Sequence, residues 1–350
     1  MARVYLPYLE WPAADRSAWL KAIEDGDILD GRGPAFHWAA ATRKTNIMHY
    51  SRWLGFLATT EQLSKDASPE NRVIPDTVRA YVEHMKARIA PVTVVSSLVG
   101  LKVMMKAMAP NQNWRWLADI CNRLNRNAQP ITDKRSKMLS SGKIYCTAIK
   151  RLEVLSETSL TKRVQIVGFR NCVMLALLAA CPLRLKNFAS LTIGENFKKV
   201  GEAWLIKIPG NEVKNGKSMS FDVPGPVLPY LETYLSLVRP QLTNALHGPL
   251  WVEWSGTRLK YHSVYIAFTR ITKELFSRSI NPHLLRDCAA TALASDSYKA
   301  AQAARALLGH RRPETTQKYY IHAQQIEASR KVNDILEAAR IARAKNSRPK

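Results

Sequence analysis

Two histidines, an arginine and a tyrosine pair recur at short intervals between residues 281 and 320. His283 and Arg286 lie three residues apart, directly after Asn281-Pro282, a pair that favours the start of a helix. Both side chains would then project from a first helical turn, where an arginine fork can hold a phosphate and a histidine can exchange a proton. Such a pair, taken alone, is more often an ordinary surface feature of an amphipathic helix.

A second histidine and two tyrosines follow. His310 comes after Gly309, a residue type that commonly ends a helix, and Tyr319 and Tyr320 lie nine and ten residues further on. A tyrosine hydroxyl is a weak nucleophile at neutral pH, so attack by it requires a base and a charge-neutralised target. A tyrosine pair alone more often packs in a core. The combination predicts most of a phosphoryl-transfer site that acts on DNA.

The overall charge supports a polyanionic partner. The 350 residues include 52 Lys and Arg against 28 Asp and Glu, a net charge of +24, and residues 1–140 and 141–350 are each basic. Basic proteins gain affinity for nucleic acid by releasing condensed counterions. A ribosome-like or membrane-surface basic protein is the alternative interpretation.

Other features limit the class of protein. The five cysteines include no C-x-x-C pair, the start has no secretory pattern, and the longest apolar run, 173–180, is short for a membrane span. These features predict a soluble cytoplasmic protein with reduced thiols. No H-E-x-x-H motif or clustered set of metal ligands stands out.

Periodicity predicts a mostly helical chain with little β structure. Helices are expected at 49–57, from 75, from 91, at 114–124, from 141, at 164–180, after 229 and at 326–344, and clear strand patterns occur at 204–208 and 218–223, which predict a small β-hairpin or sheet. Residues 1–30 could form an arm or a first helix. The polar, basic stretch 127–141 is a candidate linker, either a strap along DNA or an ordinary solvated connection.

The motifs resemble the tyrosine recombinase (phage integrase-type) family. H-x-x-R at His283 and Arg286, L-G-H ending at His310, and a tyrosine nine residues later are similar to its C-terminal signature. The segment around Arg184, C-P-L-R-L-K-N-F-A-S-L, resembles the family's G-L-R-x-x-E-x-x-x-L pattern. V-K-N-G-K, residues 213–217, resembles its hairpin motif and selects Lys214, with Lys217 in reserve.

The sequence also departs from the family pattern. Asn187 stands where the family usually has an acidic residue, Asp287 where a histidine is common, and Pro182 where glycine is common. Tyr320 could be the nucleophile instead if Ile321-His322 is matched to the family's Y-x-H, but the nine-residue spacing from His310 favours Tyr319.

The resemblance implies a fold and an activity. It implies a helical core-binding, DNA-binding domain at 1–133 and an α+β catalytic domain at 134–350, together clamping duplex DNA. The expected catalytic residues are Arg184, Lys214, His283, Arg286, His310 and Tyr319. Two arginines can clamp the phosphate, and a lysine can protonate the leaving oxygen. The product is a 3′-phosphotyrosyl intermediate formed without ATP, metal or other cofactor.

The resemblance also implies partners. The protein would act as a homo-oligomer, a tetramer assembled on DNA, in which helix 326–344 docks into a neighbour; that helix could instead pack on its own domain. A partner recombinase could take part, and the bound protein would be nucleoid-associated, serving a mobile element. The alternatives are a type IB topoisomerase-like activity, an inactive DNA-binding accessory protein of the same fold, and a generic basic helical protein.

Overall fold

The computed structural model of the chain describes residues 5–27, 31–129, 138–213 and 216–296. The chain divides into two compact units, Met1–Asp133 and Lys134–Lys350. Lys214, His310, Tyr319 and Tyr320 lie outside the described residues, as does the expected helix 326–344. Most of the candidate linker, residues 130–137, lies outside them too.

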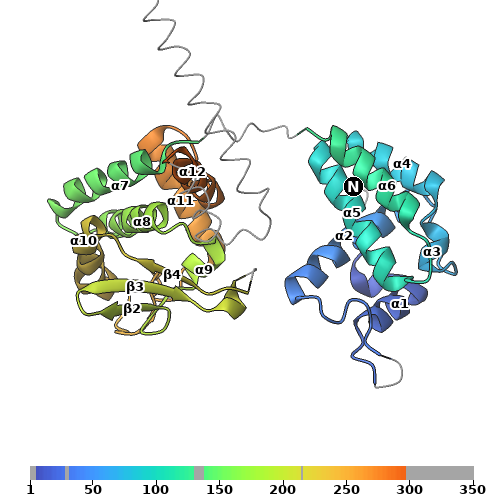
Figure 1. The fold of residues 1–350 in the computed structure, drawn as a ribbon, viewed down its shortest axis with the longest axis horizontal. Coiled ribbons are helices and arrows are strands. Elements are labelled where there is room, and N and C mark those ends of the chain that lie inside the picture. The colour runs from blue at the N-terminus through green and yellow to red at the C-terminus, as the bar shows by residue number, and fades with distance from the viewer. Residues whose placement is uncertain (1–4, 28–30, 130–137, 214–215, 297–350) are drawn as a thin grey trace, which may run out of the picture. The chain divides into compact units, whose positions relative to one another are not determined.

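The first unit is a helical bundle (Figure 1). Its helices are α1 (Ala13–Ile23), α2 (Ala40–Thr59), α3 (Pro69–Arg72), α4 (Pro75–Lys86), α5 (Pro91–Met108) and α6 (Arg115–Asn127). The four helices expected from periodicity are confirmed as α2, α4, α5 and α6. Residues 1–30 contain a first helix rather than only an arm, and Trp19 of that helix is buried.

Helix α5 forms the centre of this bundle. Pro91 occupies its first turn, where a missing backbone N–H costs nothing. Leu98, Leu101, Met104 and Met105, spaced at three and four residues, are fully buried, and α5 contacts α1, α2, α3, α4 and α6. The apolar period therefore specifies both the helix and the face that it buries.

A buried ion pair ties α1 to α3 in the first unit. The Arg72 guanidinium lies 2.5 Å from the Asp15 carboxylate, and both side chains are almost inaccessible to solvent. The Tyr50 hydroxyl of α2 donates to the same carboxylate at 2.5 Å. Burial raises the Tyr50 pKa well above its ordinary value, so the phenol stays protonated and can donate. Three helices are thus joined by one carboxylate.

The second unit combines helices with a sheet. Its helices are α7 (Ser141–Ser156), α8 (Arg163–Ala180), α9 (Leu185–Ala189), α10 (Leu228–Thr233), α11 (Tyr261–Phe276) and α12 (Pro282–Asp296). Its strands are β1 (Thr192–Ile193), β2 (Phe197–Val200), β3 (Ala203–Ile208), β4 (Met219–Asp222) and β5 (Gly248–Pro249). The helices expected from 141 and at 164–180 are confirmed as α7 and α8.

The sheet is larger than the sequence predicted. Its order is β4-β3-β2-β1-β5, and the expected hairpin is confirmed as the antiparallel β3–β4 pair. Strands β1, β2 and β5 were not predicted from the sequence. Strands β1 and β5 are two residues long and β2 is four, too short for an alternating pattern to appear in the sequence.

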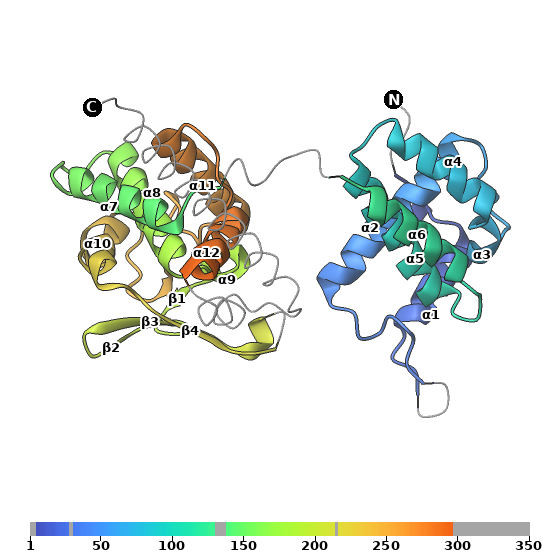
Figure 2. The ribbon, with the colours of Figure 1, turned by 45° about the horizontal axis from the view of Figure 1, so that its top comes forward.

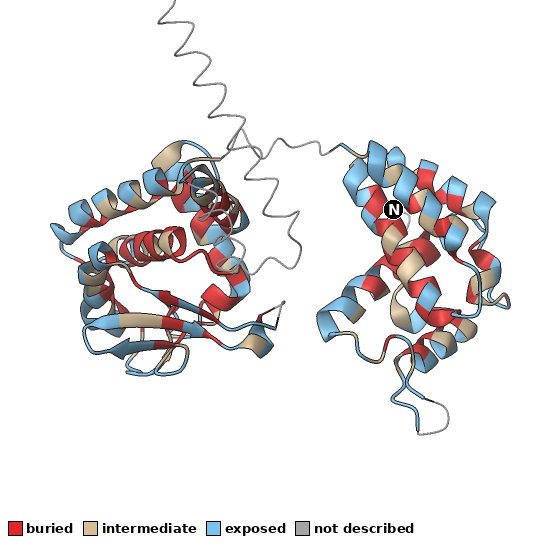
Figure 3. Ribbon diagram, viewed as in Figure 1, coloured by how far each residue is buried: buried red, intermediate tan, exposed pale blue. Residues whose placement is uncertain are grey.

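Helix α8 lies at the centre of the second unit, between α7 and the sheet (Figures 1 and 2). Every residue from Cys172 to Leu178 is buried, so α8 is apolar around its whole circumference there (Figure 3). Helices α5 and α8 are both 18 residues long and, by length and composition alone, apolar enough to cross a membrane. Most of each helix is buried within its own unit, as expected of a core helix.

Removal of the Arg72 guanidinium should destabilise the first unit strongly. Arg72→Met leaves Asp15 as a buried carboxylate without its cation, a change that costs about 3–5 kcal/mol. Hydrogen exchange measured by mass spectrometry on peptides from 5–127 reports the free energy of opening. Arg79→Met, which removes an exposed pair with Asp76, is the matched control and should cost under about 1 kcal/mol. Equal effects of the two variants would contradict this account.

Candidate active site

Arg184 lies at the junction between the central helix and the sheet. After α8 ends, the Leu183 N–H donates to the Cys181 carbonyl at 2.7 Å, and Arg184, in an extended conformation, is the residue that precedes α9. Its side chain is half-buried, and this burial lowers the pKa of the guanidinium, which nonetheless stays charged near neutral pH. The predicted arginine is therefore held on short, fixed backbone between two buried elements.

His283 and Arg286 lie in the first turns of α12. The expected helix start is confirmed: Pro282 is its first residue, and the Asn281 side chain accepts a hydrogen bond from the Leu284 N–H at 2.9 Å. The Thr272 hydroxyl of α11 accepts from the Ile280 N–H at 2.9 Å. These bonds fix where α12 enters the core.

Arg286 joins α12 to the segment that carries Arg184. Its Nη1 donates to the Pro182 carbonyl, 104 residues away in sequence, and the side chain is only 4% exposed. Pro182 lies two residues before Arg184. The structure therefore brings the two predicted arginine motifs together through one buried contact.

His283 and Arg286 do not share one environment. The sequence predicted both side chains on one face of a first turn, but His283 is exposed whereas Arg286 is buried. Arg286 reaches the backbone of the α8–α9 connection, and His283, three residues earlier, remains accessible from solvent. An accessible imidazole beside a held arginine suits proton exchange with a bound substrate.

Position 214, which lies outside the described residues, belongs to the connection between β3 and β4, residues 209–218, which includes the short 3-10 helix Gly210–Glu212. The Gly216 N–H donates to the Val213 carbonyl at 2.8 Å, and Gly216 has φ +74°, a conformation that glycine adopts readily. A Cβ at Gly210 would lie 2.4 Å from the Gly216 carbonyl oxygen, so no other residue fits there without movement. Lys217, the reserve candidate, is exposed.

Asn187 connects this loop to α9. Its side chain is buried, and its Nδ2 donates a long hydrogen bond, 3.5 Å, to the Glu212 carbonyl. Asn187 lies one helical turn after Arg184, and Glu212 lies two residues before position 214. Asn187, which stands where the family usually has an acidic residue, thus connects α9 to the loop that carries position 214. An amide can donate to a carbonyl, which an ionised carboxylate cannot do.

An aromatic contact fixes α9 against the sheet edge. The Phe188 and Trp251 rings stack with centroids 5.0 Å apart, and the Trp251 indole N–H donates to the Phe188 carbonyl at 3.0 Å. Two further buried arginines hold the chain around Trp251: Arg170 donates to the Val252 carbonyl at 2.6 Å, and Arg239 to the Pro249 carbonyl at 3.0 Å. None of these residues was singled out in the sequence, because their role depends on contacts with distant backbone.

The described part of the site contains two cationic groups and one exposed imidazole. Arg184 and Arg286 supply fixed positive charge, which favours a phosphodiester in their vicinity. Among the described residues, no group of three His, Cys, Asp or Glu side chains has the geometry of a metal site. Tyr319, Tyr320, His310 and Lys214 are not placed, so their approach to the arginines stays a prediction.

Comparisons with known proteins agree on one family. The model described as the Phage integrase family matches residues 150–326, a range that contains every candidate residue from Arg184 to Tyr319. A tyrosine recombinase, XerD of Staphylococcus saprophyticus, is 27% identical over 169 residues, covering 48% of this chain and 55% of its own length. The chain thus spans about half the length of the curated relative that it matches.

Solved structures show the same fold. The XerH site-specific recombinase bound to palindromic difH substrate, a post-cleavage complex, is similar with a TM-score of 0.56 at 15% identity. That match covers 84% of this chain and 79% of the other. The XerH pre-cleavage complex with difH has a TM-score of 0.52 at 17% identity, covering 83% of this chain and 78% of the other. The mostly helical fold with a small sheet, expected from the resemblance, is confirmed.

Removal of the Asn187 amide should loosen the β3–β4 turn. Asn187→Ala removes one hydrogen bond to the loop, worth about 0.5–1.5 kcal/mol, so amide exchange in peptides covering 210–217 should become several-fold faster. Hydrogen exchange measured by mass spectrometry tests this. Lys186→Ala, which changes an exposed neighbour on the same helix, is the control and should leave exchange unchanged. Unaltered exchange in Asn187→Ala would show that the amide does not hold the loop.

Proposed function

The chain belongs to the phage integrase family, and on that premise we propose that it is a site-specific tyrosine recombinase that cuts and rejoins duplex DNA. The observation that supports this most is the buried contact between Arg286 and the Pro182 carbonyl. It holds the second arginine motif against the first, as a clamp on one phosphate requires. The site residues support this function, because a shared fold alone does not specify an activity.

The proposed reaction is a transesterification at phosphorus. The Tyr319 oxygen attacks a DNA phosphate, the bond from phosphorus to the 5′ oxygen breaks, and a 3′-phosphotyrosyl link forms. Lys214 gives the departing 5′ oxygen its proton, and His283 or His310 takes the proton of the tyrosine hydroxyl. Rejoining runs the same steps in reverse from a 5′-hydroxyl, so bond energy is conserved and no ATP is consumed.

In this scheme the two arginines stabilise negative charge on the phosphate. Arg184 and Arg286 would each present guanidinium N–H groups to the non-bridging oxygens, where negative charge gathers in the transition state. Because the Pro182 carbonyl holds Arg286 and half-burial restricts Arg184, little reorganisation is needed when the substrate arrives. A lysine in place of either would lose the planar fork that matches two oxygens.

Duplex DNA is the proposed substrate and partner. The net charge of +24 supports it, and the XerH relatives of the same fold were crystallised with difH DNA. We place the first unit, Met1–Asp133, as the core-binding domain and the second as the catalytic domain. The same proposal includes assembly as a tetramer through helix 326–344, a role in a mobile element, and a cytoplasmic, nucleoid-associated location.

Loss of the nucleophile should abolish the covalent intermediate but not DNA binding. Tyr319→Phe should give no protein–DNA adduct on a nicked suicide substrate in EDTA, because no oxygen remains to attack phosphorus. Tyr320→Phe is the matched control and should form adducts, and both variants should bind duplex normally in a mobility-shift assay. If Tyr320→Phe loses the adduct and Tyr319→Phe keeps it, the nucleophile is Tyr320.

Removal of the terminal segment should separate binding from recombination. A variant lacking residues 326–350 should bind its DNA site with near-normal affinity but lose strand exchange, because the docking helix would be missing. Strand exchange between two labelled duplexes, measured beside DNA affinity, tests this. Full recombination by the truncated variant would refute docking by this helix.

A further inference from the structure

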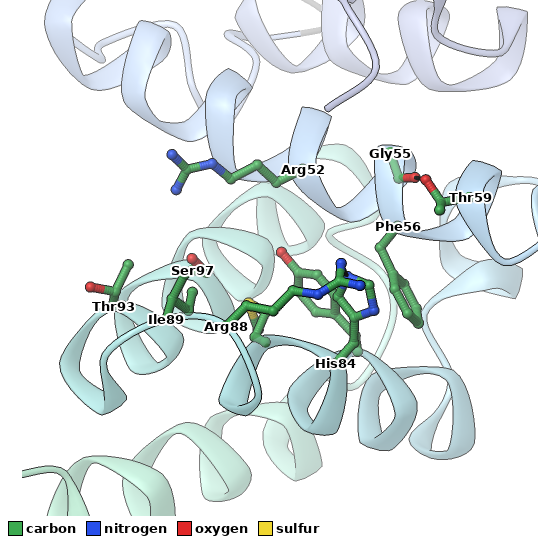
Figure 4. A pocket seen from close by; sticks show the side chains of 11 residues that line it. Arg52, Gly55, Phe56, Thr59, His84, Arg88, Ile89, Thr93 and Ser97 are labelled. Atoms are coloured by element: carbon green, nitrogen blue, oxygen red, sulfur yellow. Dashed lines mark hydrogen bonds between the residues drawn. The ribbon is translucent and has the colours of Figure 1, made fainter. Parts of the chain in front are cut away.

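A cavity in the first unit plays no part in the chemistry proposed above. It lies between α2, α4 and α5, has a volume of about 360 Å³, and is lined by residues from Arg52 to Ser97 (Figure 4). This volume is within the range of pockets that hold small organic ligands. All of its lining residues belong to the first unit, so its shape does not depend on the second.

One wall of the cavity is apolar and aromatic. Phe56 of α2 packs against Tyr81 of α4 with ring centroids 5.1 Å apart, and against His84 at the same distance. Met85 adds a buried thioether, and Ile89 is a partly exposed aliphatic side chain at the edge. A wall of this kind gains from contact with an apolar body rather than with water.

Two buried hydroxyls line the cavity without a partner in the described part of the chain. The Tyr81 Oη and the Ser97 Oγ form no hydrogen bond, although Tyr81 is 2% exposed and Ser97 is fully buried. Burial raises the Tyr81 pKa to about 12, so the phenol is protonated and has a hydrogen to donate. Unpaired buried hydroxyls are unfavourable, and a ligand oxygen that accepts from them would relieve this.

The charged groups around the cavity are cationic. Within the described residues, neither Arg52 nor Arg88 forms an ion pair, and no acidic side chain lines the cavity. Arg88 Nη1 lies 2.6 Å from His84 Nε2, and the two side chains meet at the cavity in Figure 4. Burial, and then the Arg88 charge, lower the His84 pKa, so a neutral imidazole can accept from the guanidinium.

We propose that this cavity binds a small organic anion that carries one carboxylate and an aromatic or branched apolar body. The carboxylate would pair with Arg52 and Arg88, which lack acidic partners, and the apolar body would lie against Phe56, Tyr81 and Met85. An inorganic anion would leave the apolar wall unused. A DNA phosphate would also leave the apolar wall and the two hydroxyls unused, so the chemistry favours the organic anion.

Ligand binding can be measured on the full chain without DNA or cleavage. The probe is 4-(4-fluorophenyl)butyrate, observed by fluorine NMR line broadening, and its uncharged amide is the matched control. The acid should bind with a dissociation constant of about 1 mM or tighter, as expected for a ligand of this size. The amide should bind about tenfold more weakly, because the charged pairing is lost.

Variants distinguish binding in the cavity from binding to other basic surfaces of the protein. Arg52→Gln and Arg88→Gln should each weaken acid binding about tenfold and leave amide binding unchanged. Arg79→Gln, on α4 but outside the cavity, should alter neither. Tyr81→Phe should weaken binding of the acid, and unchanged far-UV circular dichroism would show that this variant is folded.

Three outcomes would overturn the proposal. These are equal binding of acid and amide, no effect of the Arg52 and Arg88 substitutions, and displacement of the probe by a short DNA duplex whose affinity falls equally in those variants. The last outcome would assign the cavity to the DNA-binding surface. Because the assay contains no cleavage step, its failure leaves the recombinase proposal untouched, and the reverse also holds.

Discussion

The second unit depends on the hydrogen bond that the buried Arg286 guanidinium donates to the Pro182 carbonyl. A buried cation is costly unless its N–H groups are satisfied, so α12 is stable in place only when its first turns meet the α8–α9 connection at Pro182. The same contact sets Arg286 beside the backbone that carries Arg184, two residues further on. One interaction therefore couples the docking of a helix to the assembly of a phosphate clamp.

The segments that carry the other candidate residues are held in place by contacts of different kinds. Helix α9 is fixed by the Phe188–Trp251 stack, and its Asn187 amide extends to the β3–β4 turn that carries position 214. Arg184 lies just after the buried central helix α8. The proposed substrate-binding side chains thus come from chain segments far apart in sequence, and a backbone carbonyl holds Arg286.

The sequence was informative where residue type decides structure. Apolar spacing predicted α2, α4, α5, α7 and α8, because a helix must bury one face or, for α8, all of its circumference. Asn281-Pro282 predicted the start of α12. The short strands were missed because two to four residues carry no period. The contact from Arg286 to Pro182 was not predicted, because every residue has a backbone carbonyl and the sequence does not mark which one will accept. The exposure of His283 was not predicted either, because it depends on how α12 docks. The set of six catalytic candidates rested on resemblance, and three of them, Lys214, His310 and Tyr319, lie outside the described residues, as does Tyr320.

Mapping the covalent attachment on a trapped protein–DNA complex would test the central claim most directly. The full chain would be incubated in EDTA with a suicide substrate that contains its site, digested with protease, and the nucleotide-bearing peptide sequenced by mass spectrometry. The account predicts one modified residue, Tyr319, linked to a 3′ phosphate. A 5′ linkage, an adduct that forms only with divalent metal, or attachment to a residue other than the tyrosine pair would contradict it.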